Sequence, residues 1–207
     1  MPIINDTETK LELLRQRLKN YICGKRYAHT LAVESEINNL CGIFALGESE
    51  TFYLRVAALL HDVTKEKDTT EQIELCLQGG IPYGDDEIFS PKVFHAMTAP
   101  IIIKRDFPEY DTENVILPVR YHTTGRPGMT LTEKLLYLAD YIEPTRTFPD
   151  CVLLRNEFYG ASDPADPKHL KRILLLSYNM TVRNLLDEGA QIHPQTVLAM
   201  NALIREE

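Results

Sequence analysis

The sequence lacks the features that mark membrane, secreted and metal-stapled proteins. No apolar run approaches the roughly eighteen residues of a transmembrane helix. The first residues, MPIINDTETK, contain neither a basic segment nor a long apolar one, so no secretory signal is expected. The four cysteines form no CxxC pair, which argues against a zinc finger or a dense disulfide framework. We therefore expect a cytoplasmic protein with no membrane partner.

Positive charge is also scarce. The chain has 22 Lys and Arg against 30 Asp and Glu, a formal net charge of −8. General nucleic-acid binding needs a basic face, so nucleic acid is not an expected partner. A small phosphorylated substrate in a local basic pocket remains compatible with this charge.

The residue pattern predicts one helix after another. No convincing strand, internal repeat or low-complexity segment is visible among the 207 residues, of which 44% are hydrophobic and 25% charged. The economical interpretation is an all-α fold with a single domain over residues 1–207. Within it, residues 25–146 would carry the site, and C-terminal helices at 166–206 would pack on that part.

Capping residues, prolines and glycines give approximate helix limits. A first helix is expected to open at Asn5 with Glu8 and to run through Leu18. Further helices are expected at about 25–45, 48–65, 68–79, 112–122, 130–143 and 166–188, with others starting at Ser90–Pro91 and at His193–Pro194. Pro100 is expected to kink or end the helix that contains it. Residues 145–165 have mixed character and turn signals.

The stretch AALLHDVTKEK, residues 57–67, combines apolar and polar character. Val56, Leu59, Leu60 and Val63 have the spacing of one buried helix face. The adjacent pair His61–Asp62 cannot then be wholly exposed. A buried carboxylate without a partner costs several kcal/mol, so something should compensate Asp62.

Other polar residues also lie in or beside apolar helical faces. With the His61–Asp62 pair they form a set of six: His29, His61, Asp62, His95, His122 and Asp140. Any one histidine is more often an ordinary hydrogen-bonded residue than a ligand, and Asp140 alone could pair with an arginine. As a set, imidazoles and carboxylates suit zinc, iron, manganese and cobalt. Six ligands suffice for two metal ions that share Asp62 and clamp a phosphoryl group.

Basic residues occur close to these candidates in the sequence. Arg26, Lys65, Arg126 and Arg146 follow or precede them by three to six positions. Each alone would usually be a solvated charge, but their recurrence indicates a phosphate pocket. The loop residues Thr123, Thr124 and Gly125 could add hydroxyl and backbone donors to it.

The order His29, His61–Asp62, Asp140 resembles the HD-domain metal-dependent phosphohydrolases, an all-α superfamily. The closer resemblance is to the bacterial YqeK-like family of symmetrical diadenosine-tetraphosphate hydrolases. It spans about residues 20–204 and rests on four stretches: KRYAHTLAV (25–33), AALLHDVTKE (57–66), RYHTTGRPGMTLTEKLLYLADYIEPTR (120–146) and IHPQTVLAMN (192–201).

The resemblance implies roles for the residues that match. One metal would be held by His29, His61, Asp62 and Asp140, with Asp62 bridging to a second held by His95 and His122. The metals would be iron-type, with manganese, cobalt or zinc as alternatives. A metal-bridged hydroxide would split the tetraphosphate into two nucleoside diphosphates.

The resemblance also implies that Lys65, Arg126 and Arg146 bind phosphate. The residues expected to take part in catalysis are Asp62, Lys65 and Arg126. For Arg26 two roles stay open, contact with phosphate or support of a metal ligand. Glu143 is a candidate for orienting substrate or ions. The segment FHAMTAP around His95 departs most from the family pattern, and Thr64 stands where a small apolar residue is usual.

Two other functions remain open at this stage. One is a different nucleotide phosphohydrolase on the same fold, and the other is a nucleotide-binding sensor with negligible turnover. A homodimer is also an open possibility.

Overall fold

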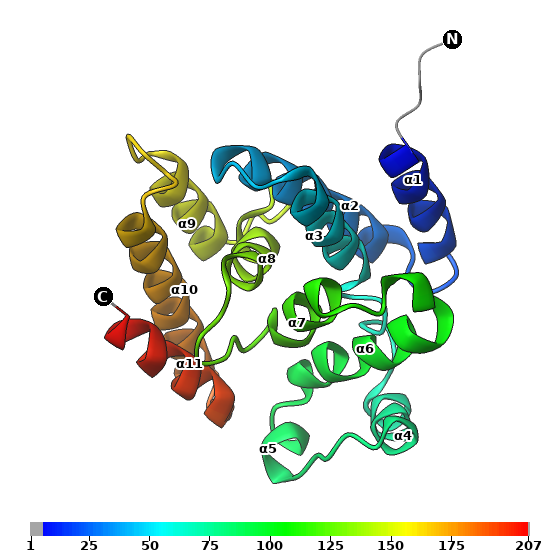
Figure 1. The fold of residues 1–207 in the computed structure, drawn as a ribbon. Helices are drawn as coiled ribbons and strands as arrows, with labels where there is room; N and C mark the ends of the chain where they lie inside the picture. The colour runs from blue at the N-terminus through cyan, green and yellow to red at the C-terminus, as the bar shows by residue number, and fades with distance from the viewer. Residues whose placement is uncertain (1–5, 207) are drawn as a thin grey trace.

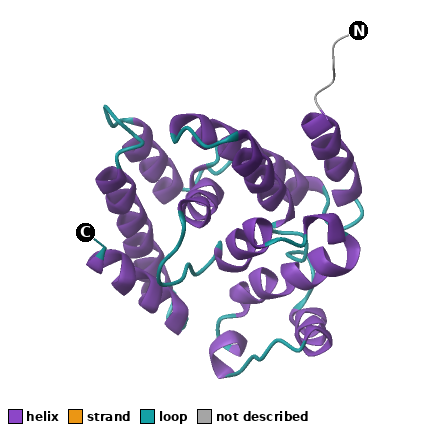
Figure 2. Cartoon of the chain, viewed as in Figure 1, coloured by secondary structure: helices purple, strands orange, loops and turns teal. Residues whose placement is uncertain are grey.

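A computed structural model describes residues 6–206 of the chain, so the predicted helix cap Asn5 lies outside the described residues. Within that range every regular element is a helix, which confirms the prediction of an all-α fold (Figures 1 and 2). The α-helices are α1 (Asp6–Leu18), α2 (Gly24–Ile43), α3 (Glu48–Leu60), α4 (Thr69–Gly79), α5 (Asp85–Ile88), α6 (Phe94–Asp106), α7 (Glu113–Tyr121), α8 (Leu131–Ile142), α9 (Pro149–Tyr159), α10 (Pro167–Asp187) and α11 (Pro194–Arg205). Two 3₁₀ turns, η1 (Pro91–Val93) and η2 (Pro108–Tyr110), flank α6.

Helix α8 lies near the centre of the bundle in Figure 1. It contacts α2, α3 and α7 on one side and α9 and α10 on the other. The C-terminal helices α9–α11 thus form one flank, and α4–α6 lie at the other (Figure 1). A continuous buried apolar cluster joins Leu11 of α1, Leu59 of α3, Leu138 of α8 and Leu203 of α11.

Local sequence signals fix several helix starts. Asp68 accepts a hydrogen bond from the Glu71 N–H, and Thr130 accepts one from Glu133; the glutamates bond back to the cap backbone. Such reciprocal capping satisfies two backbone donors that a helix start leaves free. Asp166 and His193 cap α10 and α11, each followed by proline at the first turn.

Helix α3 ends earlier than the sequence pattern predicted. It stops at Leu60, and residues 61–66 form turns. The ring Nδ1–H of His61 donates to the carbonyl oxygen of Ala58 (2.6 Å). In a continuing helix that carbonyl would accept the N–H of residue 62. The side chain therefore competes with the next helical hydrogen bond where the helix ends.

Two other features bear on the expectations. Pro100 lies inside α6 and does not end it, because Ala99, Ile102 and Ile103 are buried and hold the helix against the core up to Asp106. Residues 149–159, part of the segment of mixed character, form α9. Its buried residues Cys151, Leu154 and Phe158 follow helical spacing.

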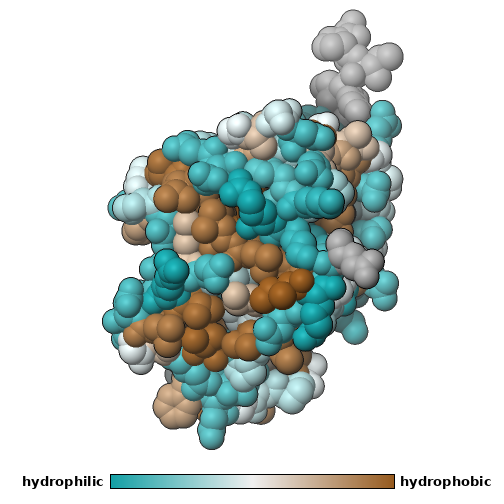
Figure 3. Space-filling model, turned by 90° about the vertical axis from the view of Figure 1, so that its left-hand side faces the viewer, coloured by the Kyte–Doolittle hydropathy of each residue, from teal (hydrophilic) through white to brown (hydrophobic). Residues whose placement is uncertain are grey.

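The flank formed by the C-terminal helices carries apolar surface in patches broken by polar side chains (Figure 3). Exposed apolar side chains of α9 and α11 include Leu153, Leu198 and Ile204. No helix in the described range has the length and apolar character needed to cross a bilayer.

The loop before α8 depends on a glycine. Gly125 has φ +65°, and a Cβ there would lie 1.9 Å from the Tyr178 hydroxyl oxygen. Gly128 in the same loop has φ +68°, but a Cβ added at that residue would meet nothing within 4 Å. Gly128→Ala should therefore lose only the left-handed preference, about 1–2 kcal/mol of unfolding free energy. Gly125→Ala adds overpacking and should lose about 2–5 kcal/mol.

Urea denaturation of both variants measures this difference. Adding Tyr178→Phe to Gly125→Ala should recover part of the lost unfolding free energy, because the Tyr178 hydroxyl oxygen is the atom that the new Cβ would overlap. Equal losses for the two alanine variants would contradict the close approach of Tyr178.

Candidate metal centre

Two of the six predicted ligands sit directly after helix ends. His61 follows α3 and His122 follows α7. Each ring donates Nδ1–H to the carbonyl oxygen three residues earlier, Ala58 for His61 and Val119 (2.7 Å) for His122. A proton fixed on Nδ1 leaves the Nε2 lone pair free for a ligand. Both rings are buried, so their direction is also fixed by packing.

Asp62 lies at the centre of the cluster, 2% exposed. Its Oδ2 atom lies 3.4 Å from His61 Nε2 and 3.8 Å from His29 Nε2. Its Oδ1 atom lies 3.2 Å from His95 Nε2 and 3.9 Å from His122 Nε2. The two oxygens thus face different pairs of imidazoles, as a carboxylate shared by two cations would require.

His29 of α2 and Asp140 of α8 complete one side of the cluster. The Asp140 Oδ1 atom lies 3.0 Å from His29 Nε2 and 3.9 Å from His61 Nε2. At the other nitrogen of the His29 ring, Nδ1 lies 3.0 Å from Oε1 of the buried Glu143. A carboxylate behind a histidine orients the ring and makes its outer nitrogen a better ligand.

His95 of α6 completes the other side. Its Nε2 atom lies 3.0 Å from His122 Nε2, and Lys65 Nζ lies 3.1 Å from its Nδ1. The structure therefore brings together all six side chains that the sequence singled out. They come from α2, the turn after α3, α6, the end of α7 and α8.

The donor set fits metal ions. His29 Nε2 and His61 Nε2 are buried and make no hydrogen bond of good geometry in the described part of the chain, although carboxylate oxygens of Asp140 and Asp62 lie 3.0 and 3.4 Å from them. Two overlapping groups have ligand atoms within 4.8 Å of one another, His29–His61–Asp140 and His61–Asp62–His122. Buried nitrogens without partners are rare unless they serve a ligand. Four imidazoles and two carboxylates are also the ligand types that divalent transition metals take.

Three basic side chains compensate the carboxylates. Arg26 Nη1 lies 2.6 Å from Asp62 Oδ2, and Arg146 Nη2 lies 2.6 Å from Asp140 Oδ1. Lys65 adds a third positive charge beside His95. The partner that the buried Asp62 required is thus a set of imidazoles together with an arginine.

Burial and charge act in opposite directions on the acidic members. Burial by itself would raise the pKa of Asp62, but His61, His95 and Lys65 hold that pKa well below its usual range. For Asp140, Arg146 and His29 likewise outweigh burial and keep the pKa well below normal. Both carboxyls are therefore charged at neutral pH.

The histidines divide into two groups. Burial lowers the pKa of His95 far below its usual value and that of His122 to about 4. Burial opposes the charged form of His29 too, but Asp140 and Glu143 outweigh it and raise its pKa to about 9. His95 and His122 are therefore neutral, while ligation at His29 must displace a proton.

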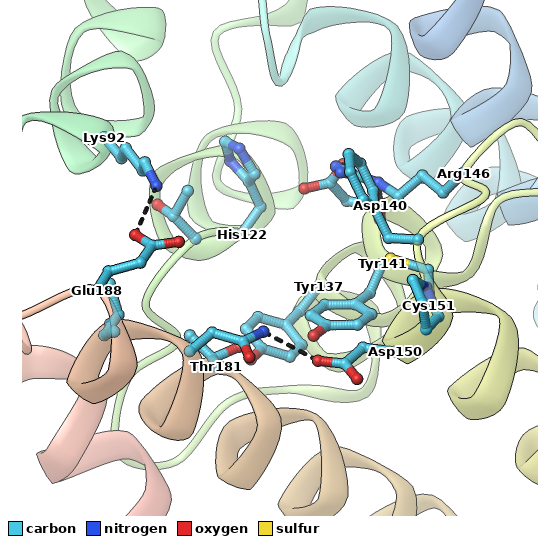
Figure 4. A pocket seen from close by; sticks show the side chains of 15 residues that line it. Lys92, His122, Tyr137, Asp140, Tyr141, Arg146, Asp150, Cys151, Thr181 and Glu188 are labelled. Carbon is cyan, nitrogen blue, oxygen red and sulfur yellow. Dashed lines mark hydrogen bonds and ion pairs between the residues drawn. The ribbon is translucent and has the colours of Figure 1, made fainter. Parts of the chain in front are cut away.

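A cleft of about 640 Å³, the main cleft, opens beside the cluster. His122, Asp140 and Arg146 line it, and the rings of Tyr137 and Tyr141 lie on the side opposite His122 (Figure 4). This volume is typical of a small-molecule site. The cluster therefore borders a space that can admit a substrate.

The other residues predicted to bind substrate have varied surroundings. Thr123 lines the main cleft, and its buried Oγ1 has no partner among the described residues. Thr124 Oγ1 donates to Gly125 O (3.0 Å), and the Gly125 N–H donates to Tyr121 O (2.8 Å). Their roles stay predictions.

Arg126 faces a buried acid. Its Nε and Nη2 atoms bond the two oxygens of Glu133 (2.6 and 2.9 Å), and Glu133 is 1% exposed. Its guanidinium also lies 5.3 Å from the centre of the Tyr121 ring. This pairing anchors the loop to the start of α8, and phosphate binding by Arg126 stays a prediction.

Two supporting groups were missed by the sequence analysis. Arg155 of α9 donates to the backbone carbonyls of Ile142, Glu143 and Arg146, and so holds the turn that carries two residues of the site. No sequence signal pointed to it, because α9 itself was not expected.

The second group is a buried polar network behind His95. Gln72 Nε2 donates to Thr64 O (2.7 Å), Thr98 Oγ1 donates to Gln72, and Thr64 Oγ1 donates to His95 O (3.0 Å). The network fastens the turn after α3 to α4 and α6. Thr64, which stands where the family usually has a small apolar residue, therefore takes part in this hydrogen-bond network.

Comparisons with known proteins agree with this geometry. The chain is 30% identical to the symmetrical bis(5'-nucleosyl)-tetraphosphatase of Bacillus subtilis (strain 168), over 95% of this chain and 97% of the relative. The protein of the same name from Staphylococcus aureus (strain NCTC 8325 / PS 47) is 31% identical over 84% and 89%. The one from Halalkalibacterium halodurans is 29% identical over 93% and 96%.

A solved structure and a family profile point the same way. A crystal structure from Clostridium acetobutylicum, described as a predicted HD superfamily hydrolase involved in NAD metabolism, superposes with a TM-score of 0.83. The two sequences are 33% identical, and the match covers 95% of this chain and 97% of the other. The HD domain profile matches residues 26–145, a segment that contains all six cluster residues. The chain therefore belongs to the HD domain family.

Proposed function

We propose that this protein hydrolyses dinucleoside tetraphosphates symmetrically, with diadenosine tetraphosphate and water giving two ADP. The observation that carries the proposal is the position of Asp62, whose two oxygens face separate pairs of imidazoles beside an open cleft. The relatives named symmetrical bis(5'-nucleosyl)-tetraphosphatases match nearly the whole chain, which supports this substrate class.

The cofactors in this proposal are two divalent ions, with iron as the first candidate and manganese, cobalt or zinc as alternatives. His29, His61, Asp62 and Asp140 would hold one ion, and Asp62, His95 and His122 the other. When bound, such ions supply Lewis-acid activation of water and neutralise phosphoryl oxygens. Hydrolysis adds the oxygen of water to one central phosphorus and breaks the bridge to the other.

The chain's own residues bind and orient the phosphates. Arg146 lines the main cleft beside Asp140, and Lys65 lies against His95, so each presents positive charge next to the cluster. A guanidinium can bind two phosphate oxygens at once and so fixes their orientation. The hydroxyl of Thr123 offers a further donor at the wall of the cleft. Arg26 contacts Asp62 directly and orients that ligand.

Two other functions compete with this proposal. The same centre could serve another nucleotide phosphohydrolase, and a sensor could bind nucleotide without turnover. A cytoplasmic location, the absence of nucleic-acid partners and the homodimer stay predictions.

The products decide among these functions. Purified protein loaded anaerobically with iron should convert diadenosine tetraphosphate to ADP alone, as measured by anion-exchange chromatography. A panel containing ATP, NAD and a cyclic dinucleotide should react much more slowly. ATP plus AMP as products would contradict symmetrical cleavage, faster turnover of a panel member would favour another phosphohydrolase, and tight ADP retention without hydrolysis would favour the sensor.

Removal of the central carboxylate should abolish metal binding and activity together. Asp62→Ala deletes the group shared by both halves of the ligand set, so metal content and turnover should both fall to background. Circular dichroism monitors folding. The exposed Asp111→Asn, a carboxylate change in the turn between η2 and α7, should retain both properties. A folded Asp62→Ala protein with full activity would refute the ligand assignment.

Glu143 should act through His29. In Glu143→Gln the carboxylate charge behind the ring is lost, and metal affinity should fall about 10–100-fold. Competition with a chromogenic chelator measures this affinity without relying on activity. The exposed Glu157→Gln on α9 should leave it unchanged. Unaltered affinity in Glu143→Gln would show that its contact with His29 does not tune the metal site.

A further inference from the structure

A second cavity, the side pocket, adjoins the main cleft. It has a volume of about 300 Å³, and it shares Lys92, Thr123, Thr181, Leu185 and Glu188 with the main cleft. The main cleft extends from these shared residues past His122 and Asp140, which are labelled with Lys92 and Glu188 in Figure 4. The two cavities therefore adjoin along these shared residues, and the metal cluster lies on the wall of the main cleft.

The side pocket has the chemistry of a nucleoside site. Phe89, Pro91, Val93, Leu185 and Ala190 give it a largely apolar lining. Most of the lined surface is apolar, but the polar side chains at the pocket are numerous: Ser90, Lys92, Thr123, Thr124, Thr181, Glu188, Gln191, His193 and Thr196. A mostly apolar surface with polar groups along it suits a nucleobase, whereas a phosphate chain would need positive charge throughout.

The junction between the cavities has donors for phosphate. Thr123 lines both cavities, directly follows the cluster residue His122, and has a buried Oγ1 with no partner among the described residues. Lys92 lies 3.8 Å from Glu188, with side chains 80% and 59% exposed. An exposed pair of this kind contributes little stability, so the lysine can turn to an anion.

We propose that the side pocket binds one nucleoside of the substrate while the main cleft binds the other. This inference rests on the proposed function, because only a substrate with a nucleoside at each end needs both cavities. Cleavage at the middle of the tetraphosphate requires room on both sides of the reacting phosphorus. The phosphate chain then passes the cluster and the Thr123 hydroxyl, and Lys92 binds it at the junction.

Filling the side pocket should discriminate between substrates with two nucleosides and those with one. Ala190→Trp places an indole in the pocket without touching the cluster. The KM for diadenosine tetraphosphate should rise at least about tenfold, since stacking and burial of a base contribute on that scale. The inhibition constant of adenosine 5'-tetraphosphate, measured against the same substrate, should change little because its single nucleoside can use the main cleft.

A second variant tests the same pocket by deletion. Phe89 is 65% exposed, so Phe89→Ala should leave folding intact and still raise the KM for the dinucleotide selectively. Leu198→Trp on the exposed face of α11 is the matched control and should change neither constant. Thermal unfolding confirms that each variant is folded.

The outcomes separate the two hypotheses. If the unmodified protein does not hydrolyse diadenosine tetraphosphate, the proposed function fails. If it does, but both pocket variants shift the two constants equally or leave both unchanged, the side pocket is not a nucleoside site. A selective rise in the KM for the dinucleotide supports it.

Discussion

The burial of one carboxylate, Asp62, constrains the whole molecule. A charge that is 2% exposed is unfavourable unless several partners face it, and here they are imidazoles and an arginine. His29 comes from α2, His95 from α6 and His122 from the end of α7, so no single helix can provide the compensation. The helices must pack in one arrangement for Asp62 to be satisfied, which makes the fold and the site parts of the same energetic balance.

Helix ends give this site its geometry. Within a helix, each backbone carbonyl accepts the N–H of the residue four positions later. At the ends of α3 and α7, the Nδ1–H groups of His61 and His122 donate to carbonyl oxygens instead. The same bond ends the helix and fixes the tautomer, so Nε2 points into the cluster. On the opposite side, Glu143 at the end of α8 orients His29, and Arg155 holds the turn that contains Glu143. Rigid helices set the positions of His29, His95 and Asp140, and helix ends set the direction of His61 and His122.

The sequence predicted the all-helical fold and the six cluster residues because both depend on local pattern. Capping residues mark helix starts, and a polar residue within an apolar face is visible in a single segment. The early end of α3 was missed because it depends on a side chain bonding to backbone, which apolar spacing does not encode. Helix α9 was missed because the exposed apolar residues Val152 and Leu153 lie between its buried ones and obscure the helical spacing, and because its start resembles a turn. Arg126 shows the same limit, since its spacing from His122 does not reveal the buried Glu133 that it faces.

Charge explains how an acidic protein can present a site for a polyphosphate. Three cations, Arg26, Lys65 and Arg146, lie beside three carboxylates, Asp62, Asp140 and Glu143, so these side chains balance locally once ligation has displaced the proton of His29. The net charge of −8 therefore resides on other parts of the chain. A tetraphosphate chain carries about four negative charges, and the proposed pair of divalent ions carries about four positive charges. Because the protein side chains cancel, the attraction for the substrate depends on the metals, and binding and catalysis then require the same ligands.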